Sequence, residues 1–329
     1  MIRGILFQIT GECMTLSRTS LTLLAGIVCV LILATAIFAG CTSGTQQPAP
    51  VTTTTMATPA AVVATTPVAP VVTTSVTTAA PTSTPAPVFS APAGSLVVFT
   101  AASLSGASKT IGPSFTAAYP GHNVAFDLDG TQALKTQVEN GAYADVFISA
   151  SNSYTNALQS EGYFVNGTVR KLTTNYVILI LPASNTANIT SLADLAKPGI
   201  KIAMEAREVP AGTAALAVLA SLANSTYSQG WENATIKNVV TYETSEPAVA
   251  TKVSLGEVDA GFVYQSTYSA APAGTYVAIT IPKKDNYLQT YTIGILNEST
   301  NKDTAASFEQ YMLSSAGQGI LTNYGFTPP

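Results

Sequence analysis

Four short turns carry the residues best suited to chemistry, because each places a small or hydroxyl residue where a strand-like run gives way to a helix-like one. The first follows the apolar run 96–99 and presents Ser103, and the others present Thr131, Ala211 and Ser245 with Glu246. A helix start leaves backbone N–H groups unpaired and carries the positive end of the helix dipole. Such turns can hold an anion, although a serine or threonine there also serves simply as a helix cap.

Glycine and proline support this interpretation at the second and third turns. Gly130 allows a tight turn before Thr131. Pro210 suits the first position of a helix, and Gly212 lets a ligand come close to the backbone. The N–H of Ala211 is then the donor that this turn offers.

The fourth turn and the strand that follows it add two more candidates. Ser245 and Pro247 mark a helix start at which the N–H of Glu246 remains free. Tyr264 ends the apolar run 260–264, so its side chain either emerges at the carboxyl end of a strand or packs in the core.

The composition excludes several classes of function. The chain has 329 residues and a formal net charge of −4, which argues against a nucleic-acid-binding surface. Its three cysteines, Cys13, Cys29 and Cys41, all precede residue 95, so the region beyond has no disulfide framework and no cysteine metal site. The single histidine, His122, follows a Pro-Gly turn. We therefore expect neither histidine-based catalysis nor a resident metal or cofactor, and, with no paired acid–base carboxylates in the four turns, not an enzyme.

Residues 1–41 have the pattern of an export signal. An apolar stretch from Ser20 to Ala39 follows Arg18 and ends in Phe-Ala-Gly-Cys, with Met14 as an alternative start to Met1. The final cysteine resembles that of a lipobox, which implies cleavage before Cys41 and lipid attachment to it. An uncleaved signal anchor is the alternative. Either anchor would hold the rest of the chain on the outer face of the cytoplasmic membrane.

Residues 42–94 predict a disordered, semi-rigid stalk, since threonine, proline and alanine dominate and no charged residue occurs. The folded region is expected to begin near Ser95. It contains five acceptor patterns for N-glycosylation in segments predicted as loops. They lie at Asn166, Asn188, Asn224, Asn233 and Asn297.

Strand-like and helix-like segments alternate beyond residue 95. Strands are expected at 96–100, 124–128, 146–148, 176–181, 202–204, 239–242, 261–264, 277–281 and 292–296, and helices at 104–119, 132–140, 154–161, 192–196, 212–223, 246–255, 304–313 and 317–324. This alternation predicts an α/β fold of mainly parallel sheets flanked by helices, with ligands at the carboxyl ends of the strands. The number of strands favours two lobes, 95–175 with 290–329 and 176–289, with the ligand in the cleft between them.

Taken together, these segments resemble the periplasmic molybdate-binding proteins of ABC importers, which have the type II substrate-binding fold. The resemblance runs from about Val97 to Phe326. It is carried in order by FTAASL at 99–104, GAYADVFIS at 141–149, LADLAKPG at 192–199, VPAG at 209–212, GEVDAGFVY at 256–264 and YGF at 324–326.

The resemblance implies a function and a set of ligands. It predicts a monomeric lipoprotein that binds molybdate or tungstate and delivers it to a membrane permease. The oxyanion ligands of the family fall on Ser103, Thr131, Ala211, Glu246 and Tyr264. The chain departs from the family at Thr131, where a serine is usual, and at Glu246, where an apolar residue is usual in the bacterial proteins.

Glu246 leaves the coordination open. Archaeal tungstate-binding relatives use carboxylates from this region and from the turn at Val209 to expand the coordination of the metal, but this chain has valine where those relatives carry an aspartate. We favour plain four-oxygen binding with the Glu246 carboxylate turned away from the anion. None of the proposed donors titrates between about pH 6 and 8, so the affinity for the anion should change little over that range. The alternatives are another oxyanion, chiefly sulfate, or an anchored extracellular sensor or adhesive module.

Overall fold

The computed structural model describes residues 94–329. The predicted export signal, the lipid attachment at Cys41 and the stalk lie outside these residues. Within residues 94–329, no helix is both long enough and apolar enough to span a membrane.

Nine strands of the described residues form one sheet with the order β2-β1-β3-β9-β4-β7-β5-β6, and β8 pairs with β4 beside this path. The strands are β1 (Ser95–Ala101), β2 (Asn123–Asp129), β3 (Val146–Ser149), β4 (Arg170–Pro182), β5 (Ile202–Glu205), β6 (Val239–Glu243), β7 (Ala260–Tyr264), β8 (Tyr276–Thr280) and β9 (Leu288–Ile295). All nine predicted strands are present. Two of them, β4 and β9, begin several residues earlier than the apolar runs indicated.

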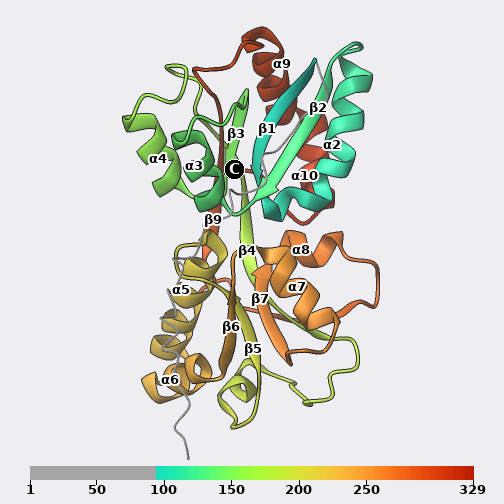
Figure 1. The fold of residues 1–329 in the computed structure, drawn as a ribbon. Coiled ribbons are helices and arrows are strands. Elements are labelled where there is room, and N and C mark those ends of the chain that lie inside the picture. Colours follow the sequence, from blue (N-terminus) through green and yellow to red (C-terminus); the bar gives the residue numbers. More distant parts are fainter. Residues whose placement is uncertain (1–93) are drawn as a thin grey trace, which may run out of the picture. The chain divides into compact units, whose positions relative to one another are not determined.

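The long strand β4 divides the sheet into two groups. Its first part, Arg170–Tyr176, pairs with β9, whereas Val177–Pro182 pairs with β7 and β8. We call β1, β2, β3 and β9 the first strand group, and β5, β6, β7 and β8 the second strand group. Figure 1 shows the two groups at opposite ends of β4.

The prediction of mainly parallel sheets is only partly correct. Pairs β1–β2, β1–β3, β5–β6 and β5–β7 are parallel, but β3–β9, β4–β7, β4–β8 and β4–β9 are antiparallel. The antiparallel pairs arise because β4 and β9 run in opposite directions through the middle of the sheet. The carboxyl ends of β1, β2, β5, β6 and β7 still lead into helices, as expected for a fold that positions helix N-termini.

Helices cover both groups (Figure 1). They are η1 (Ala102–Leu104), α2 (Ser105–Ala118), α3 (Thr131–Glu139), α4 (Asn152–Ser160), η2 (Leu192–Ala196), α5 (Pro210–Ser225), α6 (Gln229–Lys237), α7 (Glu246–Ser254), α8 (Gln265–Ala270), α9 (Lys302–Leu313) and α10 (Ser315–Asn323). The predicted helix at 192–196 is a 3-10 helix, and α6 and α8 were not predicted. One large hydrophobic cluster continues from the first group into the second, and includes Leu104, Leu179 and Phe262.

The five predicted glycosylation acceptors are all exposed asparagines. The prediction that all lie in loops is wrong for two of them, because Asn224 is in the last turn of α5 and Asn233 is inside α6. Helix α6 lacked a clear apolar stripe in the sequence, since Trp231 and Thr235 supply its buried residues.

Candidate functional site

Ser103 lies in the short helix η1 that joins β1 to α2, and its side chain caps neither helix. Its hydroxyl oxygen is 2.7 Å from the hydroxyl oxygen of Tyr291 in β9, and both residues are buried. The hydroxyl also reaches the carboxylate of Glu246. The geometry therefore supports the functional interpretation of Ser103 over simple capping.

Thr131 is the first residue of α3, and it too makes no side-chain cap. Its hydroxyl oxygen accepts a hydrogen bond from the backbone N–H of Ala150, at 3.1 Å. This bond fixes the side chain and leaves its own O–H as a donor. The side chain is only 1 % exposed, so that donor lies in a buried place.

The N–H of Ala211 donates to a carboxylate of the protein itself, that of Glu205. Ala211 follows Pro210 at the start of α5, and its N–H donates to the carboxylate of Glu205 at 3.0 Å. The N–H of Gly212 donates to the same carboxylate. A side chain at Gly212 could not be accommodated, since a Cβ there would lie 2.1 Å from the carbonyl oxygen of Ala206.

Glu246 is the first residue of α7 and is 3 % exposed. One oxygen of its carboxylate accepts from the backbone N–H of Tyr264, at 2.6 Å, and from the hydroxyl of Thr267, at 3.0 Å. The carboxylate therefore ties the start of α7 to the junction of β7 and α8.

Tyr264 ends β7 and is almost completely buried. Its hydroxyl donates to the side-chain oxygen of Gln289, at 3.0 Å. Its ring meets that of Tyr291 edge to face, with centroids 6.1 Å apart. Both of its partners come from β9, so this strand supplies a side of the site that sequence reasoning missed.

Burial and mutual repulsion control the charges at this site. Burial, followed by the nearby negative charge of Glu246, raises the pKa of Glu205 well above its ordinary value, although the amides of Ala211 and Gly212 oppose the shift. Burial also raises the pKa of Glu246 from 4.5 to about 7, against the hydrogen bonds from Tyr264, Thr267 and Ser103. Burial raises the pKa of Tyr264 and of Tyr291, so both remain neutral donors.

The Glu246 carboxyl, with its pKa raised by burial to about 7, is therefore a group that the flat pH dependence expected from the sequence did not include. Within residues 94–329, the ion pairs of Lys and Arg involve other carboxylates, and none reaches Glu205 or Glu246. The same residues contain no cluster of three or more His, Cys, Asp or Glu that could hold a metal ion.

The start of α3, which follows β2 of the first strand group, contacts the turn between β6 and α7 near Glu246. The side chain of Gln132, next to Thr131, donates to the carbonyl oxygen of Thr244 at 3.3 Å. A Cβ at Gly130 would lie 2.7 Å from that same carbonyl oxygen. Thr244 is two residues before Glu246, so the second and fourth predicted turns face each other.

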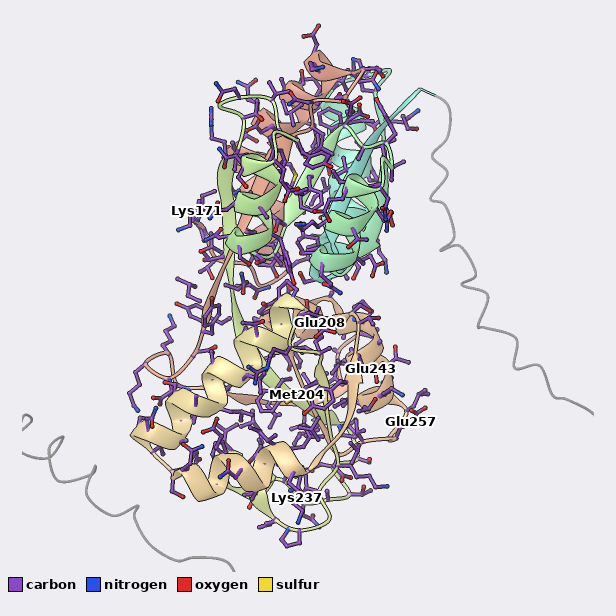
Figure 2. The ribbon with its side chains drawn as sticks, turned by 60° about the vertical axis from the view of Figure 1, so that its left-hand side comes forward. Lys171, Met204, Glu208, Lys237, Glu243 and Glu257 are labelled. Atoms are coloured by element: carbon purple, nitrogen blue, oxygen red, sulfur yellow. The ribbon has the colours of Figure 1, made fainter. Side chains whose placement is uncertain are left out.

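A second contact between the groups is the hydrogen bond from the hydroxyl of Tyr154 to the carbonyl oxygen of Glu208. Figure 2 shows Glu208 at the end of the second group that faces the first. A cavity of about 200 Å³ lies here and is lined from both groups, by residues that include Tyr154, Pro210 and Gln289. It borders the site, because Pro210 precedes Ala211 and Gln289 binds Tyr264.

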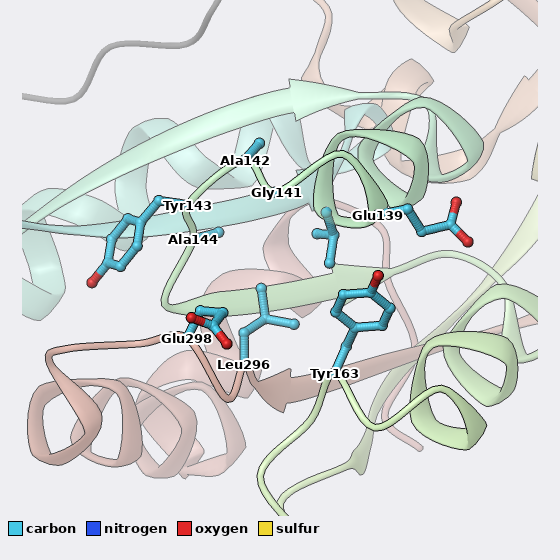
Figure 3. Close-up of a pocket in the computed structure, with 9 residues that line it drawn as sticks. Glu139, Gly141, Ala142, Tyr143, Ala144, Tyr163, Leu296 and Glu298 are labelled. Carbon is cyan, nitrogen blue, oxygen red and sulfur yellow. The ribbon is translucent and has the colours of Figure 1, made fainter.

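A different cavity, of about 300 Å³, lies in the first strand group and has Tyr143, Tyr163, Leu296 and Glu298 in its lining (Figure 3). None of the five predicted ligands lines it. The candidate site is therefore the buried set of residues that these contacts join. It includes Ser103, Ala211, Glu246 and Tyr264, and adds Glu205, Gln289 and Tyr291. Thr131 bonds to Ala150 and not to any of these residues.

Comparison with known proteins gives consistent results. Residues 96–327 match the family model described as bacterial extracellular solute-binding protein. The molybdate-binding protein ModA of Mycobacterium tuberculosis is 33% identical over 239 residues, which cover 72% of this chain and 86% of that protein.

Two solved structures have a similar fold. The periplasmic molybdate-binding protein of Azotobacter vinelandii gives a TM-score of 0.62 at 21% identity, over 71% of this chain and 99% of that one. The sulfate-binding protein SubI of Mycobacterium tuberculosis gives a TM-score of 0.64 at 17% identity, over 71% and 86% of the two chains. At these identities the likeness concerns the fold alone.

Proposed function

The chain belongs to the family of bacterial extracellular solute-binding proteins, which bind solutes and are not enzymes, and we propose that it captures molybdate or tungstate for an ABC importer. The observation that carries this proposal is the convergence of Ser103, the Ala211 turn, the Glu246 turn and Tyr264 on one buried polar site. These are the positions at which the sequence resembles the ligands of molybdate-binding proteins.

The donors suit a tetrahedral dianion. Hydroxyls of Ser103, Thr131 and Tyr264 and the amide of Ala211 would each donate to an anion oxygen, and the starts of α5 and α7 add the positive ends of two helix dipoles. A hydrogen bond to a charged acceptor contributes about 1.5–3 kcal/mol. Several such bonds in a buried site would therefore support tight binding without a counter-cation.

The mode of binding that we propose is closure of two lobes, 95–175 with 290–329 and 176–289, around the anion. The change of partners along β4 at Tyr176 and Val177 supports this division. The contacts of Gln132 with Thr244 and of Tyr154 with Glu208 would belong to the closed form. An anion that binds donors from both lobes stabilises this form, which a membrane permease would then recognise.

We further propose plain four-oxygen coordination, with Glu246 contributing its backbone N–H. The bonds of its carboxylate to Tyr264 and Thr267 support this arrangement, because they hold the carboxylate among protein donors. In this proposal the protein is exported, carries a lipid on Cys41 or a signal anchor, and acts as a monomer at the outer face of the membrane.

Isothermal titration calorimetry with molybdate, tungstate and sulfate tests the function. We expect tight binding of molybdate or tungstate and binding of sulfate that is at least about tenfold weaker. Tighter binding of sulfate would instead make the protein a sulfate carrier. No heat from any of the three anions would refute oxyanion capture and favour a sensor or adhesive module on this fold.

A further inference from the structure

The two amides at the start of α5 donate to a side chain of the protein itself. The carboxylate of Glu205 accepts the N–H groups of Ala211 and Gly212 at the start of α5. Glu205 ends β5 and is 3 % exposed, and Met204 and Glu208, which precede and follow it along the chain, lie in the second strand group (Figure 2). An oxyanion can receive the Ala211 amide only if this carboxylate gives it up.

A second carboxylate makes this arrangement electrostatically costly. Glu246, on α7, is also buried and contributes negative charge at Glu205. Two carboxylates and a dianion could not share a closed site without compensation, since like charges repel strongly where water is absent.

The surroundings of the pair offer no compensating cation. Tyr264 of β7 and Tyr291 of β9 face both carboxylates as neutral hydroxyls. On β6, Glu243 pairs with Glu205 in the sheet register, and its carboxylate is 3.7 Å from Lys252 of α7. Among the described residues no Lys or Arg forms an ion pair with Glu205 or Glu246, and α5 presents only backbone amides to Glu205.

We propose that the Glu205–Glu246 pair is a proton-accepting part of the oxyanion site, so that the pair takes up a proton from solvent as the anion binds and Glu205 releases the Ala211 amide. This inference rests on the proposed function. The proton converts a repelling carboxylate into a neutral carboxyl, which can donate a hydrogen bond to the anion. The raised pKa of both groups agrees with this step, because it places proton uptake near neutral pH.

The same step would contribute to selectivity. Molybdate and tungstate are conjugate bases of weaker acids than sulfate is, so their oxygens accept a hydrogen bond from a neutral carboxyl more strongly. A site that donates from a carboxyl therefore favours the more basic oxyanion, in addition to any effect of cavity size.

Calorimetry on the wild-type protein tests the proposal directly. Molybdate is titrated at pH 8 in buffers that differ in ionisation enthalpy, which reports the number of protons taken up. We expect about one proton per molybdate, and an affinity that falls about tenfold per pH unit above pH 7. Binding with no proton uptake and equal affinity at pH 6.5 and 8.5 would overturn the proposal.

Variants identify the groups that take up the proton. In E205Q/E246Q both carboxyls are replaced by neutral amides, so proton uptake should vanish and the affinity should become independent of pH. E243Q is the matched control, since it changes a glutamate on the neighbouring strand and should keep the wild-type proton uptake. Full proton uptake in E205Q/E246Q would assign it elsewhere and overturn the proposal.

The two hypotheses fail in different ways. If molybdate and tungstate do not bind at any pH, the proposed function fails. If they bind tightly without proton uptake, the function stands and only the inference fails. Because the proton count is measured on the wild-type protein, a variant that does not fold leaves this decision intact.

Discussion

The stability of the empty protein should fall as pH rises, because Glu246 is buried with a raised pKa. Below pH 4.5 this carboxyl holds its proton in both the folded and the unfolded state. Between 4.5 and about 7 only the folded protein retains the proton, so the folded state binds more protons than the unfolded one. The free energy of unfolding therefore decreases with pH over this interval and is lowest above it.

The size of the effect follows from the shift. A rise in the pKa of Glu246 from 4.5 to about 7 corresponds to a change of about 3 kcal/mol in the free energy of unfolding, since one pKa unit is about 1.4 kcal/mol. Glu205 acts with the same sign, because burial raises its pKa too. The wild-type protein should thus lose about 3 kcal/mol or more of unfolding free energy between about pH 4.5 and 8.

Urea unfolding at pH 5 and pH 8, followed by the fluorescence of the single tryptophan Trp231, measures this difference. In E246Q the difference should shrink by about 2–3 kcal/mol, because the amide has no proton to lose. E257Q changes an exposed glutamate of the same region and should behave like wild type. A wild-type difference that persists unchanged in E246Q would refute the assignment to this carboxyl.

Three further predictions concern ligand binding. S103A and Y264F each remove a hydroxyl donor and should weaken molybdate binding about ten- to a hundredfold in calorimetry, with the fold intact by circular dichroism; unchanged affinity would assign these hydroxyls to the internal network alone. T131V should lower the affinity for molybdate by about tenfold, because a hydroxyl donor is lost. It should also lower stability by about 1 kcal/mol, because the backbone N–H that bonds to Thr131 loses its acceptor. A loss of stability without a loss of affinity would contradict a ligand role. In G130A the methyl group of the new alanine would press on the carbonyl oxygen of Thr244. We therefore expect molybdate binding that is at least about tenfold weaker and a molybdate-loaded protein that is more open in small-angle scattering. Wild-type affinity and compactness would show that this close approach does not matter.

Most strands could be predicted because their apolar runs are short, β-branched and bounded by turn residues. The starts of β4 and β9 were missed, since Arg170–Asn175 and Leu288–Thr290 are largely polar and are held as strands by pairing with each other. That pairing is tertiary, so no local pattern reports it. Helix α8 was missed because its six residues include few apolar ones.

The four turns were correctly recognised as places where small and hydroxyl residues begin helices. The sequence alone left capping open for Ser103 and Thr131. The structure decides this point, because neither side chain bonds to the first turn of a helix, and each bonds instead to another element of the fold.

Tyr291 and Glu205 could not be found from the same signals. Tyr291 lies in the part of β9 that precedes the predicted strand, and its role depends on Ser103, 188 positions away. Glu205 is the last residue of β5, one position beyond the predicted strand end, and six residues before the amide that it binds. A glutamate at a strand end is usually solvated, and only the packing of α7 against β5 brings Glu246 near it.

The carboxyl pair changes how the site is understood. The sequence indicates an anion site made of neutral donors and helix ends, for which affinity depends on the number of donors and the size of the cavity. The structure adds two buried acids whose charges oppose that same anion. A buried dianion beside two carboxylates is repelled by both, and among the described residues no Lys or Arg ion pair reaches either acid, so the proposed proton uptake is the compensation that this arrangement calls for. If the proposed proton uptake occurs, the affinity for the anion depends on pH, and a measurement at a single pH would report only one point of that dependence.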